Sequence, residues 1–204
     1  MAAHEILVWS DYICPFCRLG HSLATWLEEE HDAEVTWLPF ILHPEYPPAG
    51  LPREALLRRY GGAFHEQLLQ RFADEGLAYN PHPDVVPNTT TALRLSELAR
   101  DLGQHAAFHD RLMDAYWNDG VDIGDAGELR ALAHDLPAGE VERVLTSDAY
   151  LDRVRASTAQ AQTIGVDGVP GWLIDGKLLV PGAQPREVFE QVFAQLAAPA
   201  PVEG

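Results

Sequence analysis

Two cysteines stand close together near the start of the chain, in the stretch SDYICPFCRLG that runs from residue 10 to residue 20. Cys14 and Cys17 are the only thiols among 204 residues, and only Pro15 and Phe16 separate them. Two thiols at this spacing can form and open a disulfide with each other, which is the chemistry of thiol–disulfide exchange. The pair therefore predicts a redox site in which one sulfur attacks a substrate disulfide and the other releases the product.

The residues after Cys14 predict a helix that begins at Pro15, a residue suited to a first helical turn. Its apolar stripe, at spacings i, i+4, i+7 and i+8, consists of Leu19, Leu23, Trp26 and Leu27. The N–H groups of a helix N-terminus favour an anion, so Cys14 is the predicted nucleophile, exposed at that end. Cys17 lies one turn further along the same face and is the predicted resolving thiol, sheltered from solvent.

Four neighbours of the thiols are candidates for supporting roles. Pro15 stiffens the turn between the cysteines, and Phe16 can offer an apolar contact to a substrate. Both are candidate substrate-binding residues. Arg18, one turn along, is a candidate to stabilise the thiolate. Asp11 can either cap the turn before the helix or accept a proton, and the capping role is favoured.

Two structural interpretations of the cysteine pair are weaker. A disulfide across so short a loop contributes only about 2 kcal/mol in the chain-entropy model. A structural zinc site needs four ligands, and the chain has no second cysteine pair. Of the nine histidines, only His21 falls on the helix that carries the cysteines.

A second chemical signal lies in TIGVDGVPGWLIDG, residues 163–176. Pro170 stands at the start of an expected strand, where its missing N–H donor costs nothing, and the Val169–Pro170 bond is predicted to be cis. A proline so placed lets the backbone before it pair with an extended substrate as an added strand. Val169 and Pro170 are therefore candidate substrate-binding residues.

The order of predicted elements defines a fold. Residues 5–9 and 33–42 predict strands around the first helix, and 171–180 predicts a hairpin with Asp175-Gly176 at its turn. Helices are predicted at 89–102, 106–117, 147–164 and 183–197, and no strand is predicted in the hundred residues after Pro52. The loop 80–88 divides that helical region.

This order, βαβ followed after a helical insertion by αββα, predicts an α/β thioredoxin fold with a large all-helical insertion domain. Residues 1–48 and 150–198 form the predicted thioredoxin-like domain, which is discontinuous in sequence. Residues 49–149 form the insertion, and residues 199–204 form a tail predicted to be disordered.

Composition excludes some functions. The formal net charge is −17, so the chain is expected to bind neither nucleic acid nor an anionic membrane surface. No stretch of about 18 apolar residues predicts a membrane-spanning helix. The N-terminus lacks the basic region of a signal peptide, which predicts a cytoplasmic location where thiols are kept reduced.

Aromatic residues and histidines receive structural interpretations. Trp9, Trp26, Trp37 and Trp117 are expected in the core, whereas Trp172 is expected near the redox site because it follows Pro170. His65, His105 and His109 fall in helical segments. At least two of them are expected to face solvent or to bond locally, and none is needed for catalysis.

Three further segments support a resemblance. Besides SDYICPFC, they are PNTTTALRLSELA, FHDRLMDAYWNDGVDIGD and IGVDGVPGWLIDGKLLVPGAQP. Together they resemble the DsbA-like thioredoxin family, in particular its cytoplasmic FrnE-like branch of dithiol–disulfide oxidoreductases and isomerases, from about residue 4 to residue 197. The resemblance implies Cys14 as nucleophile, Cys17 as resolving thiol and a cis Val169–Pro170 bond. It implies no bound metal or organic cofactor, with protein or small-molecule thiols and disulfides as partners and glutathione as a candidate co-substrate.

The chain departs from that family at two points. Periplasmic DsbA has a histidine where this chain has Phe16, which weakens the expectation of a strong oxidase. The strand before the motif, Leu7-Val8-Trp9, lacks the buried acid that many thioredoxin-fold proteins carry there.

Two other function classes remain open. One is a glutathione-dependent isomerase or transferase of the hydroxychromene carboxylate isomerase or kappa-class type, although those enzymes carry a serine where Cys14 stands. The other is a redox-inactive binding or chaperone module.

Overall fold

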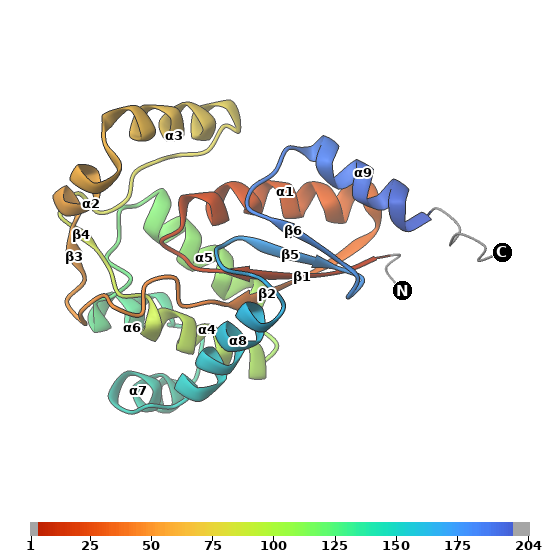
Figure 1. Cartoon of the computed structure of the whole chain (residues 1–204). Coiled ribbons are helices and arrows are strands. Elements are labelled where there is room, and N and C mark those ends of the chain that lie inside the picture. Colours follow the sequence, from red (N-terminus) through yellow and green to blue (C-terminus); the bar gives the residue numbers. More distant parts are fainter. Residues whose placement is uncertain (1–3, 198–204) are drawn as a thin grey trace.

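The computed structural model describes residues 4–197, and its centre is a four-stranded sheet (Figure 1). The strands lie in the order β2–β1–β5–β6, with bounds His4–Ser10 for β1, Ala33–Pro39 for β2, Gly171–Ile174 for β5 and Leu178–Pro181 for β6. β1 and β2 are parallel and are joined by α1 (Pro15–His31), whereas β5 and β6 are antiparallel neighbours. The predicted βαβ unit and hairpin are confirmed. The tail at 199–204 lies outside the described residues.

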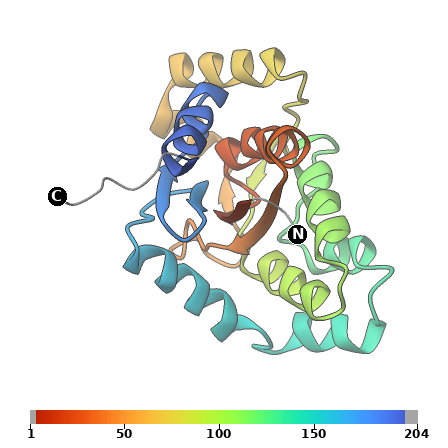
Figure 2. The same ribbon diagram turned by 90° about the vertical axis from the view of Figure 1, so that its right-hand side faces the viewer.

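Helices cover both faces of the sheet (Figure 2), with α1 and α9 (Arg186–Ala197) on one side and α8 (Leu151–Thr163) on the other. Successive side chains of a strand point to opposite faces. Ile6 and Val8 of β1 accordingly belong to the buried cluster under α1 and α9, while Trp9 belongs to the cluster on the other side. All three are fully buried, so β1 is the centre of the core.

The second strand is shorter than predicted. It ends at Pro39, whereas the sequence predicted it to run to residue 42. The reason is that the next backbone donors have side-chain partners: the Ile41 N–H donates to the Thr158 hydroxyl at 3.0 Å, and the Leu42 N–H donates to the Asp11 carboxylate at 2.9 Å.

The hairpin turn forms where Asp175-Gly176 predicted it. Both residues have positive φ angles, 52° and 64°, which aspartate and glycine tolerate. The Asp175 carboxylate also accepts a hydrogen bond from the Glu5 backbone N–H at 3.0 Å and binds the His4 ring at 2.9 Å. The turn is therefore tied to the start of β1.

Between the two halves of the sheet the chain is mostly helical. The helices are α2 (Arg53–Tyr60), α3 (Gly62–Asp74), α4 (Thr90–Asp101), α5 (His105–Trp117), α6 (Ala126–Leu132) and α7 (Ala138–Thr146). Two short strands, β3 (Leu51–Pro52) and β4 (Val85–Val86), pair antiparallel within this region. The expectation of no strand there was wrong, because two-residue strands are too short to show an alternating pattern.

Helix α8 begins later than the predicted residue 147. Tyr150, directly before it, has a left-handed conformation with φ 64°. The buried guanidinium of Arg94 donates to the Val144 carbonyl at 2.7 Å and to the Ala149 carbonyl at 2.6 Å, and it also binds the Ser147 carbonyl. These bonds hold residues 147–150 as a turn. The last helix likewise begins three residues late, at Arg186.

One cluster of buried residues runs from the sheet into the helical region. It contains Trp9 and Cys17 together with residues of α4, α5 and α7 such as Leu95, Leu112 and Val144. The division into a thioredoxin-like domain and an insertion at residues 48 and 150 stays a prediction. Among the described helices, none combines the length and the apolar character that a bilayer crossing needs.

The segment after Pro170 offers a test of this packing. A Cβ atom at Gly171 would lie 2.5 Å from Cγ1 of the buried Val166, whereas a Cβ atom at Gly168 would meet nothing within 4 Å. We expect Gly171→Ala to lower the free energy of unfolding by about 1–3 kcal/mol, as overpacking does. Gly168→Ala, the matched control, should change it by less than about 0.5 kcal/mol. Urea titrations would measure both, and equal effects would contradict the close approach.

Candidate redox site

The two cysteines lie where the sequence placed them, at the N-terminus of α1. Cys14 is the N-cap residue, with φ −79° and ψ 116°, and Pro15 occupies the first turn. The Cys14 carbonyl accepts hydrogen bonds from the N–H groups of Cys17 at 3.0 Å and Arg18 at 3.3 Å, which begins the helix. Both thiols are free in this structure, and Cys17 lies one turn inside Cys14.

Cys14 is buried, contrary to the expectation of an exposed nucleophile. Its exposed fraction is 4%, against 0% for Cys17. The reason is a long-range contact: the Cys14 Sγ–H donates to the Val169 carbonyl at 3.3 Å, and the loop that carries Val169 covers the helix end. The Val169–Pro170 peptide bond is cis, as predicted. Cys14 lines the cavity beside this contact, which gives a substrate a route toward the sulfur.

That cavity has a volume of about 250 Å³ and is lined mainly by apolar side chains. Its floor includes Cys14, Pro15 and Phe16 from the cysteine segment, and Gly168 and Val169 from the proline loop. The outer wall comes from α2 and α3; in Figure 1, α3 lies above the cysteine end of α1 and α2 lies to the left of it. Three wall residues are large apolar side chains that remain exposed, namely Leu57, Tyr60 and Phe64.

Phe16 connects the floor of the cavity with its wall. Its ring packs edge-on against the Phe64 ring, with 6.3 Å between centroids. The Arg71 guanidinium of α3 lies 5.6 Å from the Phe16 ring centroid and donates to the Ala183 carbonyl at 3.0 Å. Phe16 and Pro15 therefore lie beside the sulfur where a substrate contact was predicted.

The surroundings of Cys17 change the acidity of its thiol. Burial raises the pKa of the Cys17 thiol well above its usual value, and the adjacent Cys14 sulfur adds to the shift. The Ser10 hydroxyl lowers the pKa of Cys17 by a smaller amount. Cys17 is therefore held as a thiol when Cys14 is also reduced. From the sequence, Ser10 was a candidate only to help end the turn before the helix, and this effect on Cys17 was not predicted.

The guanidinium of Arg18 faces the helical region. It forms an ion pair with Asp114 at 2.9 Å and a hydrogen bond with Asn118 at 3.3 Å, both at the C-terminal end of α5. The opposite charge of Asp114 offsets the field that Arg18 exerts elsewhere. Its bonds favour a role in joining α1 to α5 over the predicted stabilisation of the thiolate.

Asp11 is almost fully buried and acts as a turn cap. Its carboxylate accepts hydrogen bonds from the Ile13 N–H at 3.3 Å, the Leu42 N–H at 2.9 Å and the Thr89 hydroxyl at 3.0 Å. Burial raises the pKa of Asp11, and these bonds oppose the shift. The three bonds support the capping role and tie the cysteine turn to the segment after β2 and to the start of α4.

Trp172 does not lie where it was expected, whereas Trp117 is buried in the core, as predicted. Trp172 is fully buried in the cluster under α1 and α9, where it packs edge-on against Phe189 at 5.3 Å and donates to the Gly182 carbonyl. It does not line the cavity. Trp117 does line it and donates its indole N–H to the Tyr12 carbonyl at 2.9 Å. Sequence distance from Pro170 misled the prediction, because alternate residues of β5 point away from the site.

Comparison with known proteins agrees with this architecture. A family model described as DSBA-like thioredoxin domain matches residues 5–194. The chain belongs to the DSBA-like thioredoxin domain family. It therefore has the thioredoxin fold of that family, in a mixed α/β arrangement.

Individual relatives extend over nearly the whole chain. The probable DsbA oxidoreductase SCO1869 from Streptomyces coelicolor is 32% identical and superimposes with a TM-score of 0.87, covering 98% of this chain and 93% of its own. YwbO of Bacillus subtilis (strain 168) is 28% identical over 200 residues, which are 95% of this chain and 97% of YwbO. A 2-hydroxychromene-2-carboxylate isomerase is 17% identical with a TM-score of 0.75, covering 94% of this chain and 95% of its own, and shows a common fold alone.

The raised pKa of Cys17 predicts unequal reactivity of the two thiols. We expect Cys14 in the Cys17→Ala variant to react with iodoacetamide at neutral pH about tenfold or more faster than Cys17 in Cys14→Ala, because each unit of raised pKa removes about nine-tenths of the thiolate. Intact mass spectrometry would follow both reactions. In guanidinium chloride the two rates should converge, and equal rates in the native proteins would contradict the assignment.

Proposed function

We propose that this protein is a thiol–disulfide oxidoreductase that works through Cys14 and Cys17. The observation that carries the proposal is the position of the Cys14 sulfur, at the N-terminus of α1, beside the cis-proline loop and on the floor of the cavity. A helix N-terminus favours the thiolate that attacks a disulfide. Membership of the DSBA-like family supports the same class of chemistry.

The proposed reaction has two exchange steps. The Cys14 thiolate attacks one sulfur of a substrate disulfide, forms a mixed disulfide and releases the first substrate thiolate, which takes up a proton. Cys17 then loses its proton, attacks the Cys14 sulfur and releases the second substrate thiol, leaving a Cys14–Cys17 disulfide. Two electrons pass to the substrate, and an external dithiol or two monothiols, with glutathione as a candidate, return the pair to its reduced form. Run backwards, the same steps oxidise a dithiol.

The surroundings of Cys17 explain when it loses its proton. Its pKa is raised partly by the neighbouring Cys14 sulfur. That part of the shift comes from the thiolate form of Cys14, which no longer donates to the Val169 carbonyl; once Cys14 is bonded to a substrate sulfur it carries no charge, so this part of the shift disappears. Formation of the mixed disulfide therefore makes Cys17 more acidic at the step where its thiolate is needed.

The cavity favours an apolar group next to the substrate disulfide. The cationic side chain in its lining, Arg53, already donates to the His82 and Val85 carbonyls and to the Tyr116 hydroxyl. These bonds occupy the Nε and Nη2 groups of Arg53, whereas Leu57, Tyr60 and Phe64 offer exposed apolar surface to a substrate. We infer that disulfides flanked by apolar or aromatic side chains are preferred over charged ones such as oxidised glutathione.

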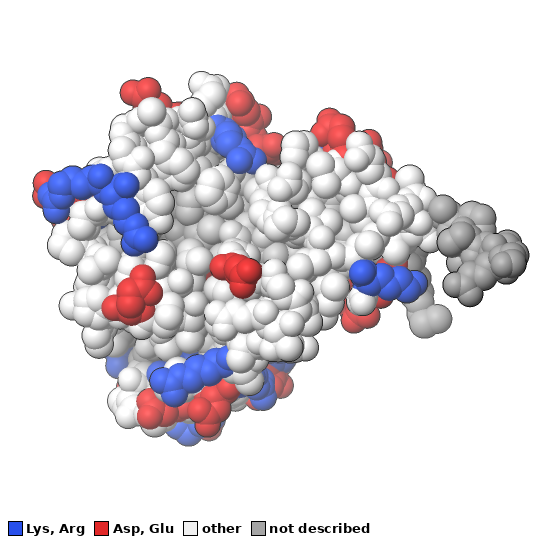
Figure 3. Space-filling view, in the orientation of Figure 1, with Lys and Arg blue, Asp and Glu red and all other residues white. Residues whose placement is uncertain are grey.

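Charge on the surface is compatible with such a partner. Figure 3 shows acidic and basic side chains scattered over one face of the molecule, with uncharged areas between them. That face has no continuous basic stripe of the kind that tracks a nucleic-acid backbone. A cytoplasmic location stays a prediction.

Trapping of the mixed disulfide tests the roles of the two thiols. Cys17→Ala should accumulate covalent adducts with disulfide substrates, because the neighbouring thiol supplies the high effective concentration that resolves them. Cys14→Ala should accumulate few, since Cys17 is fully buried. Intact mass before and after strong reductant would show the adducts. Equal trapping would overturn the assignment of the nucleophile, and a wild type without reductase activity or trapping would favour a redox-inactive binding module.

The preference of the cavity for apolar groups can be tested by comparing two peptide disulfides. Wild type should reduce a peptide disulfide with phenylalanine beside the cysteine about tenfold or more faster, in kcat/KM, than one with glutamate there, because burying one aromatic side chain stabilises by about 1.5–3 kcal/mol. Phe64→Ser should shrink this ratio. Leu69→Ser is the matched control, since Leu69 is a similarly exposed residue of α3 outside the cavity lining. A ratio near one in wild type, or an equal loss in both variants, would reject the preference.

A further inference from the structure

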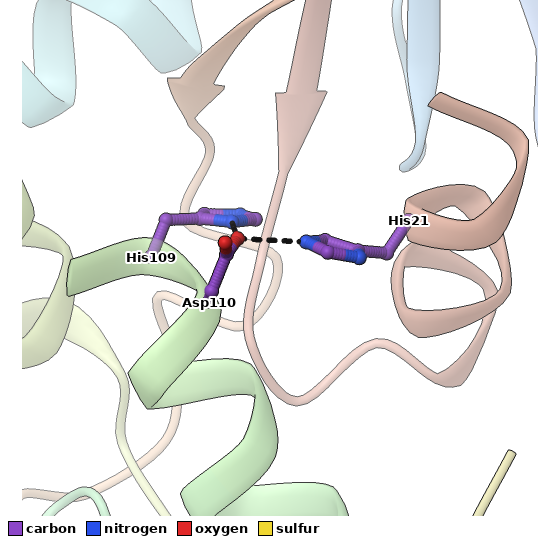
Figure 4. Close-up of side chains that lie close together, drawn as sticks. All are labelled: His21, His109 and Asp110. Atoms are coloured by element: carbon purple, nitrogen blue, oxygen red, sulfur yellow. Dashed lines mark hydrogen bonds and ion pairs between the residues drawn. The ribbon is translucent and has the colours of Figure 1, made fainter. Parts of the chain in front are cut away.

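Three donor side chains meet away from the redox site, where α1 approaches α5. They are His21 of α1 and His109 and Asp110 of α5 (Figure 4). The His21 Nε2 lies 2.9 Å from the Asp110 Oδ1, and the His109 Nδ1 lies 3.6 Å from the same oxygen. All three donor atoms lie within 4.8 Å of one another. No sequence pattern indicates this group, because 89 positions separate His21 from Asp110.

His109 is the unusual member of the group. Its exposed fraction is 3%, and neither ring nitrogen has a hydrogen-bond partner among the described residues. A buried polar group without a partner is costly and calls for an explanation, one of which is an ion. At least two of the three helical histidines were expected to face solvent or to bond locally, and His65, which is partly exposed, and His105, which bonds to Arg100 at 2.8 Å, fit that expectation. His109 is the exception.

Packing fixes the orientation of the His109 ring. Trp37 stacks on it at a centroid distance of 4.8 Å, and Tyr12 and His105 pack at 5.3 and 5.7 Å. The His21 ring lies nearly parallel to the His109 ring, at an angle of 12°. Figure 4 shows nitrogen atoms of both rings directed toward the Asp110 carboxylate between them. The group therefore holds one rigid donor and two that can adjust.

We propose that His21, His109 and Asp110 form a binding site for a divalent transition-metal ion of the Zn²⁺ class, which joins the cysteine-bearing helix α1 to helix α5. Two imidazole nitrogens and one carboxylate oxygen suit Zn²⁺ and its first-row neighbours, whereas Mg²⁺ and Ca²⁺ prefer oxygen donors alone. The ion completes the coordination of the buried His109 nitrogen. Solvent supplies the remaining ligand, because the Asp110 side chain is 56% exposed.

Two of the three separations between donor atoms are close to those of a tetrahedral metal site. Donors around a tetrahedral ion at about 2.1 Å lie about 3.4 Å apart. The separations of 2.9 and 3.6 Å lie on either side of that value, and a shift of the partly exposed His21 and Asp110 side chains reaches it. The net charge of −17 also favours a cation over an anion near the surface.

The site joins elements that another contact already holds. One turn before His21 on the same helix, Arg18 forms its ion pair with Asp114, one turn after Asp110 on α5. A bound ion therefore adds a second link between the same two helices. Its expected effect is greater stability of the α1–α5 contact, with no part in the exchange of electrons.

Calorimetric titration with Zn²⁺ tests the proposal. The full chain carrying Cys14→Ala and Cys17→Ala removes the thiolates as competing ligands. We expect one ion per chain and a melting temperature that rises with Zn²⁺ concentration. Mg²⁺ should produce neither effect. A titration with no binding, or with binding of Mg²⁺ at equal strength, would overturn the site.

Single substitutions in that background locate the ion. His21→Gln and Asp110→Asn each remove a proposed ligand. Each should weaken Zn²⁺ binding about tenfold or more, since even loss of a residue that only orients a ligand has an effect of this size. Both positions are partly exposed, so the variants should fold, which circular dichroism and melting without metal would check. His134→Gln is the matched control, an exposed histidine outside the group. Unchanged affinity in the two test variants, or an equal loss in the control, would show that any Zn²⁺ binds elsewhere.

Discussion

The hydrogen bond from the Cys14 sulfur to the Val169 carbonyl is the contact on which the site depends. It brings together the end of α1 and the loop before β5, which are 155 positions apart in the chain. The sheet makes this possible, because β1 and β5 are antiparallel neighbours and place Trp9 opposite Gly171. The residues that follow β1 and those that precede β5 therefore lie at the same end of the two strands, and both flank one cavity.

The helical region completes that site in a different way. It contains neither cysteine, but its helices α2 and α3 form the outer wall of the cavity that Cys14 lines. Polar contacts also join it to the cysteine segment: Thr89 binds Asp11, Trp117 binds the Tyr12 carbonyl, and Asp114 binds Arg18. Cys14 is thus positioned by both halves of the chain, although only one half carries it.

Local signals made much of this predictable. The spacing of Cys14 and Cys17, the helical stripe after them and the Asp175-Gly176 turn each depend on residues a few positions apart, and the structure has all three elements. The burial of Cys14 could not be read in this way, because the covering carbonyl comes from the other end of the chain. The same holds for the wall of α2 and α3 and for the place of Trp172, which depend on how distant segments pack.

The shared buried cluster has a consequence for how this fold can vary among related proteins. Trp9 of the central strand lies in the same cluster as Leu95 of α4 and Leu112 of α5, so one face of the sheet is completed by helices that interrupt the thioredoxin order. Excising those helices would leave a face of large apolar side chains open to water. The interruption is therefore not a detachable module, and changes of length should be tolerated at its outer loops rather than within the helices that meet the sheet.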